Sequence, residues 1–172
     1  MKPPRKRDRW RRLLRHLFIG HHAAQRAFPP PVRARIAAAV GDGERCHAGD
    51  IRVAIEAALH PAAVLRGMTP RQRALEVFAQ LRVWDTEHND GVLIYLLIAD
   101  RAVEIVADRG AARAVTADGW QQICAEVERH FRAGRFEAGV LSGVQAVAAH
   151  LAPRAPGAAD ANELPDAPVL LS

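Results

Sequence analysis

The sequence predicts a three-layer α/β/α domain with a mixed central sheet that contains a β-hairpin, preceded by a basic N-terminal helix. Apolar stretches of strand length alternate with longer segments whose apolar residues recur every three or four positions. Residues 92–99 are apolar at every position, which is typical of a strand buried on both faces. The 172 residues are 49% hydrophobic, enough for one well-filled core but short for two.

Composition divides the chain into three parts. Residues 1–29 form a basic amphipathic arm that ends in a stiff proline linker, residues 30–152 form the α/β domain, and residues 153–172 form an irregular tail. The tail ends in the apolar run 169–171, which favours docking of this end on another surface.

The arm predicts a short amphipathic helix over residues 9–19, because apolar side chains recur there at helical spacing with arginines opposite. Such a helix can lie on an anionic membrane surface, with contact through residues 1–28. The alternative is a helix that docks on the body or frays. The predicted lipid-facing residues are Trp10, Arg11, Arg12, Arg15 and Phe18.

Positive charge is concentrated in this arm. Residues 1–35 hold eleven Lys and Arg residues against one acid, whereas the remainder holds thirteen against eighteen. A nucleic-acid-binding domain carries basic and aromatic residues on its folded face, so no nucleic-acid partner is expected.

Neither a membrane span nor a secretory leader is expected from the sequence. Arg15 and His16 interrupt the apolar residues of the arm, and the longest apolar run has only strand length. The predicted location is the cytoplasm, at the inner face of the membrane if the arm binds lipid.

The first half of the domain predicts helix, strand, helix. A helix begins near Pro31, since proline suits the first helical turn. Residues 51–57 alternate between apolar and polar side chains and predict the first strand. Thr69 then precedes Pro70, a capping hydroxyl followed by a proline at the first position of a helix.

The second half predicts a hairpin followed by two helices. The buried strand 92–99 is joined by a tight turn at residues 100–101 to its antiparallel partner, 102–107. Helices are expected from Thr116 to about Gly134 and over residues 136–151.

The loop before the buried strand is the candidate metal site. Its carboxylate and amide oxygens are the ligands that Ca²⁺ and Mg²⁺ prefer. The return strand of the hairpin terminates at the same end of the sheet as this loop, which brings in one more carboxylate. The alternative is a solvated turn whose carboxylates cap backbone amides. The candidate ligands are Asp85, Glu87, Asn89, Asp90 and Asp108.

Several ordered motifs resemble the TPM domain family, often called TPM phosphatase. They are Gly49-Asp50-Ile51-Arg52-Val53-Ala54, then 75–78, 83–87 and 89–91 before the apolar strand, and the hairpin with Asp108-Arg109-Gly110. The resemblance covers roughly residues 30–152 and implies a mixed sheet with helices on both sides, in a module found beside envelope and membrane-associated proteins. It also implies the acid phosphatase activity and Ca²⁺ binding attributed to some members. The motif at 162–166 resembles a bacterial branch, here expected to be of a cytoplasmic type.

Two functions follow from these observations. The favoured one is a non-catalytic TPM module that recognises an unknown partner protein, associates peripherally with a membrane and holds Ca²⁺ or Mg²⁺. The alternative is a metal-assisted acid phosphatase, a phosphomonoesterase that uses the loop at 85–90 with Asp108. No organic cofactor is expected.

Overall fold

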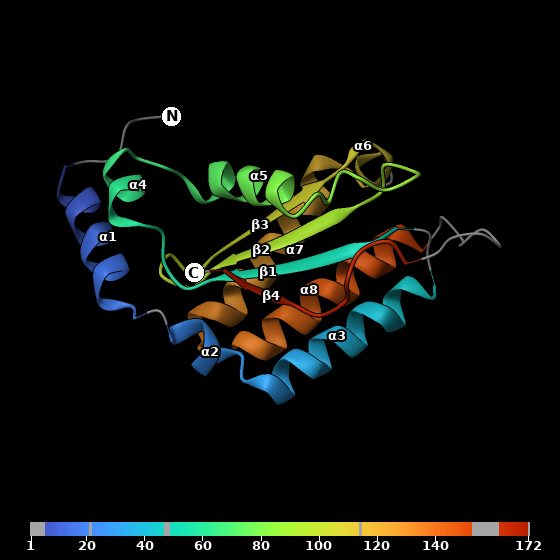
Figure 1. The fold of residues 1–172 in the computed structure, drawn as a ribbon, viewed down its shortest axis with the longest axis horizontal. Coiled ribbons are helices and arrows are strands. Elements are labelled where there is room, and N and C mark those ends of the chain that lie inside the picture. The colour runs from blue at the N-terminus through green and yellow to red at the C-terminus, as the bar shows by residue number, and fades with distance from the viewer. Residues whose placement is uncertain (1–5, 21, 47–48, 114, 153–161, 172) are drawn as a thin grey trace.

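A computed structural model describes residues 6–20, 22–46, 49–113, 115–152 and 162–171. A mixed four-stranded sheet has the order β3-β2-β1-β4, in which β1 pairs parallel with both β2 and β4, and β2 pairs antiparallel with β3. Helices cover both faces of this sheet (Figure 1). The strands are β1 (Ile51–Glu56), β2 (Val92–Leu97), β3 (Ala102–Ala107) and β4 (Val169–Leu171).

Eight helices are present in the described part of the chain. Three of them begin with proline: α3 (Pro30–Glu44), α4 (Pro61–Leu65) and α5 (Pro70–Gln80). The last also carries the predicted cap, in which the Thr69 hydroxyl accepts the backbone N–H of Gln72. The helices are α1 (Lys6–Phe18), α2 (Ala23–Ala27), α3 (Pro30–Glu44), α4 (Pro61–Leu65), α5 (Pro70–Gln80), α6 (Arg109–Ala112), α7 (Ala117–Arg132) and α8 (Phe136–Leu151).

The sheet separates two hydrophobic clusters. The larger one joins alternate residues of β1, β2 and β3, such as Val53 and Ile94, to residues of α3, α7 and α8, such as Phe131. The smaller one joins the opposite face, including Tyr95, to α4 and α5. Every residue of β2 is buried, as expected of an interior strand. The predicted three-layer α/β fold is therefore confirmed.

Several local features differ from the sequence prediction. The tail is not irregular throughout: residues 169–171 form the edge strand β4, whose pairing with β1 lies too far along the chain for local sequence patterns to reveal. The loop after β1 contains α4, and residues 109–112 form α6. Residues 153–161 of the predicted tail lie outside the described residues.

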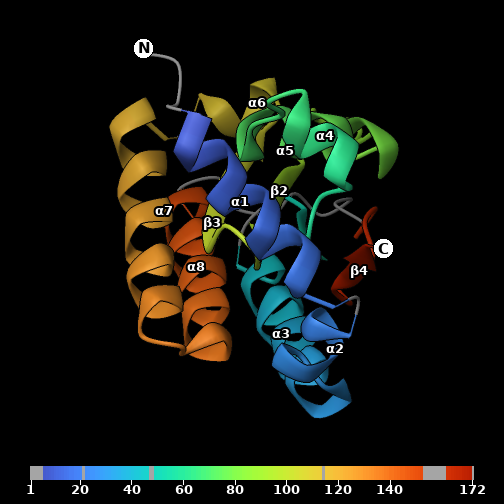
Figure 2. The ribbon, with the colours of Figure 1, turned by 90° about the vertical axis from the view of Figure 1, so that its left-hand side faces the viewer.

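The arm docks on the body as a helix. Figure 2 shows α1 lying across the end of the sheet at which β1 and β2 terminate. Its Leu13 is buried within the smaller hydrophobic cluster. The basic helix expected over residues 9–19 is therefore present, and it begins earlier, at Lys6.

Candidate functional site

Polar contacts hold α1 against the body through Asp100, in the turn after β2. This carboxylate accepts hydrogen bonds from Arg12 Nε at 2.8 Å and Arg15 Nη2 at 3.3 Å, and it lies 3.2 Å from His16 Nε2. Burial alone would raise the pKa of Asp100, but the contacts with His16 and Arg12 outweigh burial and lower this pKa. Arg12 is therefore directed toward the body, not outward as the lipid-facing set expected, and its side chain is only 19% exposed.

His16 joins the same junction to the loop after β1. Its Nδ1 accepts the backbone N–H of Leu59 at 2.9 Å, and its side chain is fully buried. Because Nδ1 is an acceptor here, the ring proton resides on Nε2, which faces Asp100. The docked face of α1 is therefore specified by directional hydrogen bonds as well as by burial of Leu13.

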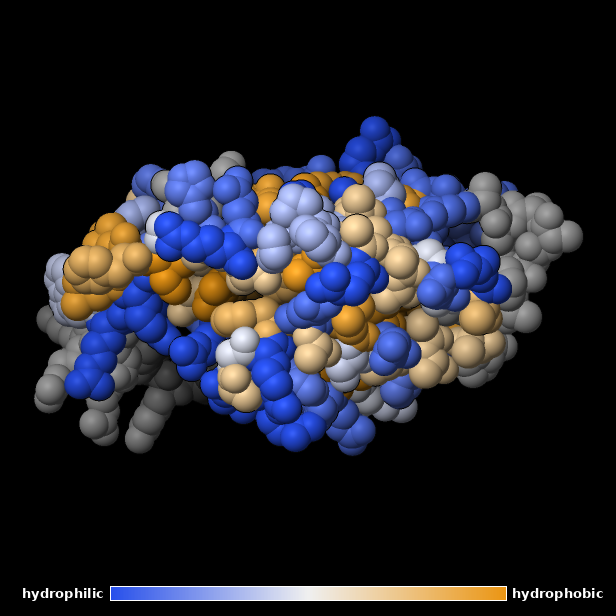
Figure 3. Space-filling model, turned by 90° about the horizontal axis from the view of Figure 1, so that it is seen from below, coloured by the Kyte–Doolittle hydropathy of each residue, from blue (hydrophilic) through white to orange (hydrophobic). Residues whose placement is uncertain are grey.

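The opposite face of α1 presents large apolar side chains to solvent. Hydrophobic side chains gather at the end of the molecule where α1 lies, with hydrophilic ones beside them (Figure 3). Arg11, Leu14, Arg15 and Phe18 line a hollow on this surface. We call the exposed apolar side chains the α1 face; they are Trp10 (62% exposed), Leu14 (47%), Leu17 (54%) and Phe18 (83%).

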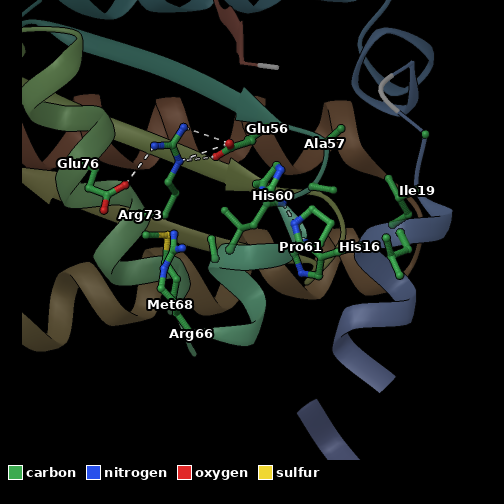
Figure 4. A pocket seen from close by; sticks show the side chains of 15 residues that line it. His16, Ile19, Glu56, Ala57, His60, Pro61, Arg66, Met68, Arg73 and Glu76 are labelled. Carbon is green, nitrogen blue, oxygen red and sulfur yellow. Dashed lines mark hydrogen bonds and ion pairs between the residues drawn. The ribbon is translucent and has the colours of Figure 1, made fainter. Parts of the chain in front are cut away.

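A pocket of 570 Å³ lies between α1 and the body, at the carboxyl end of β1. Figure 4 shows Arg73 between two carboxylates of this pocket, Glu56 and Glu76. Arg73 Nε is 2.9 Å from Glu56 Oε2, and Arg73 Nη1 is 3.1 Å from Glu76. The Tyr95 hydroxyl donates to Glu56 from the buried side at 2.5 Å.

This network determines what Glu56 can do chemically. Glu56 is 4% exposed, and Arg73 and Tyr95 together engage both of its oxygens. Burial and the neighbouring carboxylate raise the pKa of Tyr95, so its hydroxyl keeps its proton. Glu56 thus ties the end of β1 to α5 through Arg73 and to β2 through Tyr95. Sequence alone gave no reason to single it out.

The acidic loop and the end of β3 lie together, as expected. The backbone N–H of Asp108 donates to Gly91 O at 2.9 Å, and Gly110 N donates to Asn89 O at 2.7 Å. Two of the predicted ligands have other partners: Asp85 pairs with Arg82, and the Asp108 carboxylate caps the first backbone N–H of α6.

Asp90 differs from its neighbours in this loop. It is 2% exposed; one carboxylate oxygen accepts a hydrogen bond from the Thr86 hydroxyl at 3.1 Å, and the other has no hydrogen-bond partner among the residues that the structure describes. The backbone N–H of Glu87 donates to the Glu163 carboxylate at 2.9 Å, which ties the loop to the C-terminal segment. Within the described ranges, no three His, Cys, Asp or Glu side chains surround a common centre.

The C-terminal segment brings further acids to this end of the sheet. Asn162 Nδ2 donates to both Glu44 and Asp166, and Glu163 N donates to Asp50. Burial, followed by the nearby carboxylates, raises the pKa of Glu44 to about 8. The motif at 162–166 was the available signal for this grouping, but its spatial neighbours could not be read from the sequence.

Comparison with known proteins identifies the family. The model of the TPM domain matches residues 24–150. The chain belongs to the TPM domain family. The TPM domain thus includes the sheet from β1 to β3 with its covering helices, whereas α1 and β4 lie outside the matched range.

A solved structure has the same fold. The BA42 protein from the psychrophilic bacterium Bizionia argentinensis, determined by NMR, superposes on this TPM domain with a TM-score of 0.71. The two sequences are 27% identical, and the match covers 82% of this chain and 93% of BA42. Among curated proteins, none matches this sequence. In the part of the chain that the structure describes, no helix has the length and apolarity to cross a membrane.

Proposed function

We propose that this TPM domain is a binding module that attaches peripherally to an anionic membrane surface through the α1 face. The observation that carries the proposal is the division of α1 into two sides. One side of the helix forms hydrogen bonds with Asp100 and Leu59. The other side leaves the side chains of Trp10, Leu17 and Phe18 largely exposed. A helix that served only to cap the sheet would not need large apolar residues on its outer side.

The size of the α1 face is sufficient for reversible attachment. Burying a large apolar side chain is worth about 1.5–3 kcal/mol, so four that are half to four-fifths exposed offer roughly 4–7 kcal/mol before immobilisation costs. Arg11 lies beside them, and each basic residue near an anionic surface contributes about 1 kcal/mol. The docked helix is already folded, so binding does not have to supply the cost of forming it.

Flotation with phosphatidylglycerol-containing vesicles tests the proposal. Leu17→Gln should lower the partition coefficient about five- to tenfold, because it removes one inserted side chain. Leu75→Gln is the matched control, since Leu75 is 48% exposed on α5 and Leu17 is 54% exposed on α1. Equal binding by the two variants, or binding unchanged after deletion of residues 1–18, would disprove membrane attachment through α1.

A second candidate function is binding of a divalent cation beside Asp90. A buried carboxylate oxygen without a hydrogen bond is costly, and a cation such as Ca²⁺ or Mg²⁺ would offset that cost. We expect CaCl₂ to raise the unfolding temperature of the wild type and of Asp85→Asn, but not of Asp90→Asn. Turnover of p-nitrophenyl phosphate that is lost in Asp90→Asn would instead support the acid phosphatase alternative; no change in any variant would remove the cation from the proposal.

A further inference from the structure

The outer edge of β3 is an incomplete ladder. Gly91, the residue before β2, accepts a hydrogen bond at its carbonyl oxygen from Asp108 N, on the β3 side. Val92 N donates to Asp50 O on the β1 side, so the peptide groups of the odd-numbered residues of β2 point toward β3. The register then directs the peptide groups of residues 102, 104 and 106 toward β2 and those of 103, 105 and 107 away from the sheet. Figure 2 shows β3 at the opposite edge of the sheet from β4, beside α7.

Side chains occupy only the middle of this edge. Arg71 Nη1 donates to Ile105 O at 2.5 Å, and the Cys124 thiol lines the same groove as Ile105. On either side, the outward peptide groups of Val103 and Ala107 make no hydrogen bond with the described residues. The Arg71 side chain is 50% exposed and comes from the other layer, so it can move away without disturbing the sheet.

A groove of 610 Å³ runs beside this edge, between β3 and α7. Trp120 and Cys124 form its apolar wall, and Glu104 and Glu128 add negative charge. Burial raises the pKa of Glu104, with Arg71 opposing and Glu128 reinforcing the shift. Burial, with Glu104 as the next cause, also raises the pKa of the Cys124 thiol to about 11.

These groups favour a cationic occupant. Each of the two carboxylates has one arginine beside it: Arg71 lies 3.8 Å from Glu104, and Arg132 pairs with Glu128 on the outer side. If Arg71 leaves Ile105, a positive charge from the occupant can take its place. The outward N–H and C=O groups of β3 alternate at the spacing of a strand. Only a peptide with an extended backbone can pair with all of them.

We propose that this groove binds an extended peptide, which adds to β3 as a fifth strand and places a lysine or arginine side chain between Glu104 and Glu128. The peptide pairs with the outward groups of Val103, Ile105 and Ala107 and displaces Arg71. A second copy of the chain is a poorer occupant, since pairing of β3 with β3 would bring two acidic grooves together. The site is independent of the α1 face, so either proposal can fail alone.

The probe is an N-acetylated, C-amidated seven-residue peptide of alternating threonine and valine with a central lysine. Added to the ¹⁵N-labelled full chain, it should slow amide exchange of Val103 and Ala107 and shift resonances of β3 and α7. A peptide with glutamate in place of lysine should bind more weakly, and Glu104→Gln should reduce this preference. Shifts confined to other parts of the chain, or no preference for lysine, would overturn the proposal.

Variants on both sides of the interface test the pairing itself. Ala107→Pro removes one outward N–H while leaving the β2–β3 ladder intact, and should weaken binding about three- to tenfold. Methylation of alternate peptide amides should have a similar effect without any change to the protein. Arg71→Ala should bind more tightly, because no side chain has to leave Ile105. Binding indifferent to all three changes, or protection of these amides that rises with protein concentration without peptide, would refute the peptide site; the second result would assign the edge to a second copy.

Discussion

Replacing Asp100 with asparagine is expected to release α1 while leaving the sheet folded. The Asp100 side chain is 9% exposed, and two of its partners, Arg12 and His16, are 19% and 0% exposed. Removing one member of a buried ion pair costs about 3–5 kcal/mol, and the third contact, with a half-exposed Arg15, adds at most about 1 kcal/mol. Since the freed arginines reach water when α1 undocks, we expect the docking free energy to fall by about 2–4 kcal/mol.

Native-state hydrogen exchange measures this change directly. The amides of α1 and the Leu59 N–H, which is bonded to His16, should exchange about 30- to 700-fold faster in Asp100→Asn. Amides of β2 should keep their protection, because they depend on global unfolding. Asp85→Asn is the control, since Asp85 also pairs with an arginine but is 46% exposed and precedes β2, whereas α1 lies at the end of the sheet where β2 terminates (Figure 2).

Two results would refute the reasoning. If protection of α1 and Leu59 is unchanged, Asp100 does not hold the helix; if β2 loses as much protection as α1, docking is not a separate step.

The pH dependence of exchange in the wild type supplies an independent check. Because the pKa of Asp100 is lowered in the folded state, its contribution is complete above the unfolded value of about 4 and is lost as the pH falls through the lowered value. Exchange of α1 should therefore accelerate in acid before that of β2.

Three further perturbations concern the body of the domain. Tyr95→Phe removes a hydrogen bond to the buried Glu56 and should cost about 1.5–3 kcal/mol, seen as an unfolding temperature about 3–12 °C lower; an unchanged temperature would show that the bond adds nothing. Because the pKa of Glu44 is raised, its contribution to stability is complete below pH 4.5 and is lost as the pH rises through about 8. Glu44→Gln should therefore be more stable than the wild type by about 1–2 kcal/mol near pH 9 but not near pH 5. Denaturant melts at both pH values decide this, and parallel pH profiles would contradict it. Gly91→Ala places a Cβ 2.0 Å from Val83 O and should cost more than about 3 kcal/mol or prevent folding; a melt close to that of the wild type would show that the loop can move.

Local patterns predicted most of the elements because each has its own signal. Alternation in β1, continuous burial in β2 and the Thr69-Pro70 start of α5 all reflect interactions within a few residues. The pairing of β4 with β1 has no such signal. A three-residue strand is specified by the edge that it meets, and that edge is formed by residues far away in the sequence.

The candidate sites were predictable in position but not in their contacts. The sequence placed the acidic loop and Asp108 at the same end of the sheet, and the hydrogen bond from Asp108 N to Gly91 O agrees with this. It could not show that Asp85 pairs with Arg82, nor that Arg12 turns inward, because periodicity gives the face of a helix but not its partner. The apolar spacing of α1 was visible, while the division into docked and exposed sides depended on Asp100.

The edge strand β4 also has a consequence for how the chain avoids aggregation. Arg52 of β1 bonds to Ala167 O, 115 residues away, so this contact forms only after a long loop has closed. Until then, β1 offers one unpaired edge of a strongly apolar strand to any neighbouring molecule, and such edges promote intermolecular β pairing. The final residues of the described chain thus cover the otherwise unpaired edge of β1. Substitutions that weaken the pairing of β4 with β1 are expected to lower the yield of refolding more than the stability of the folded state.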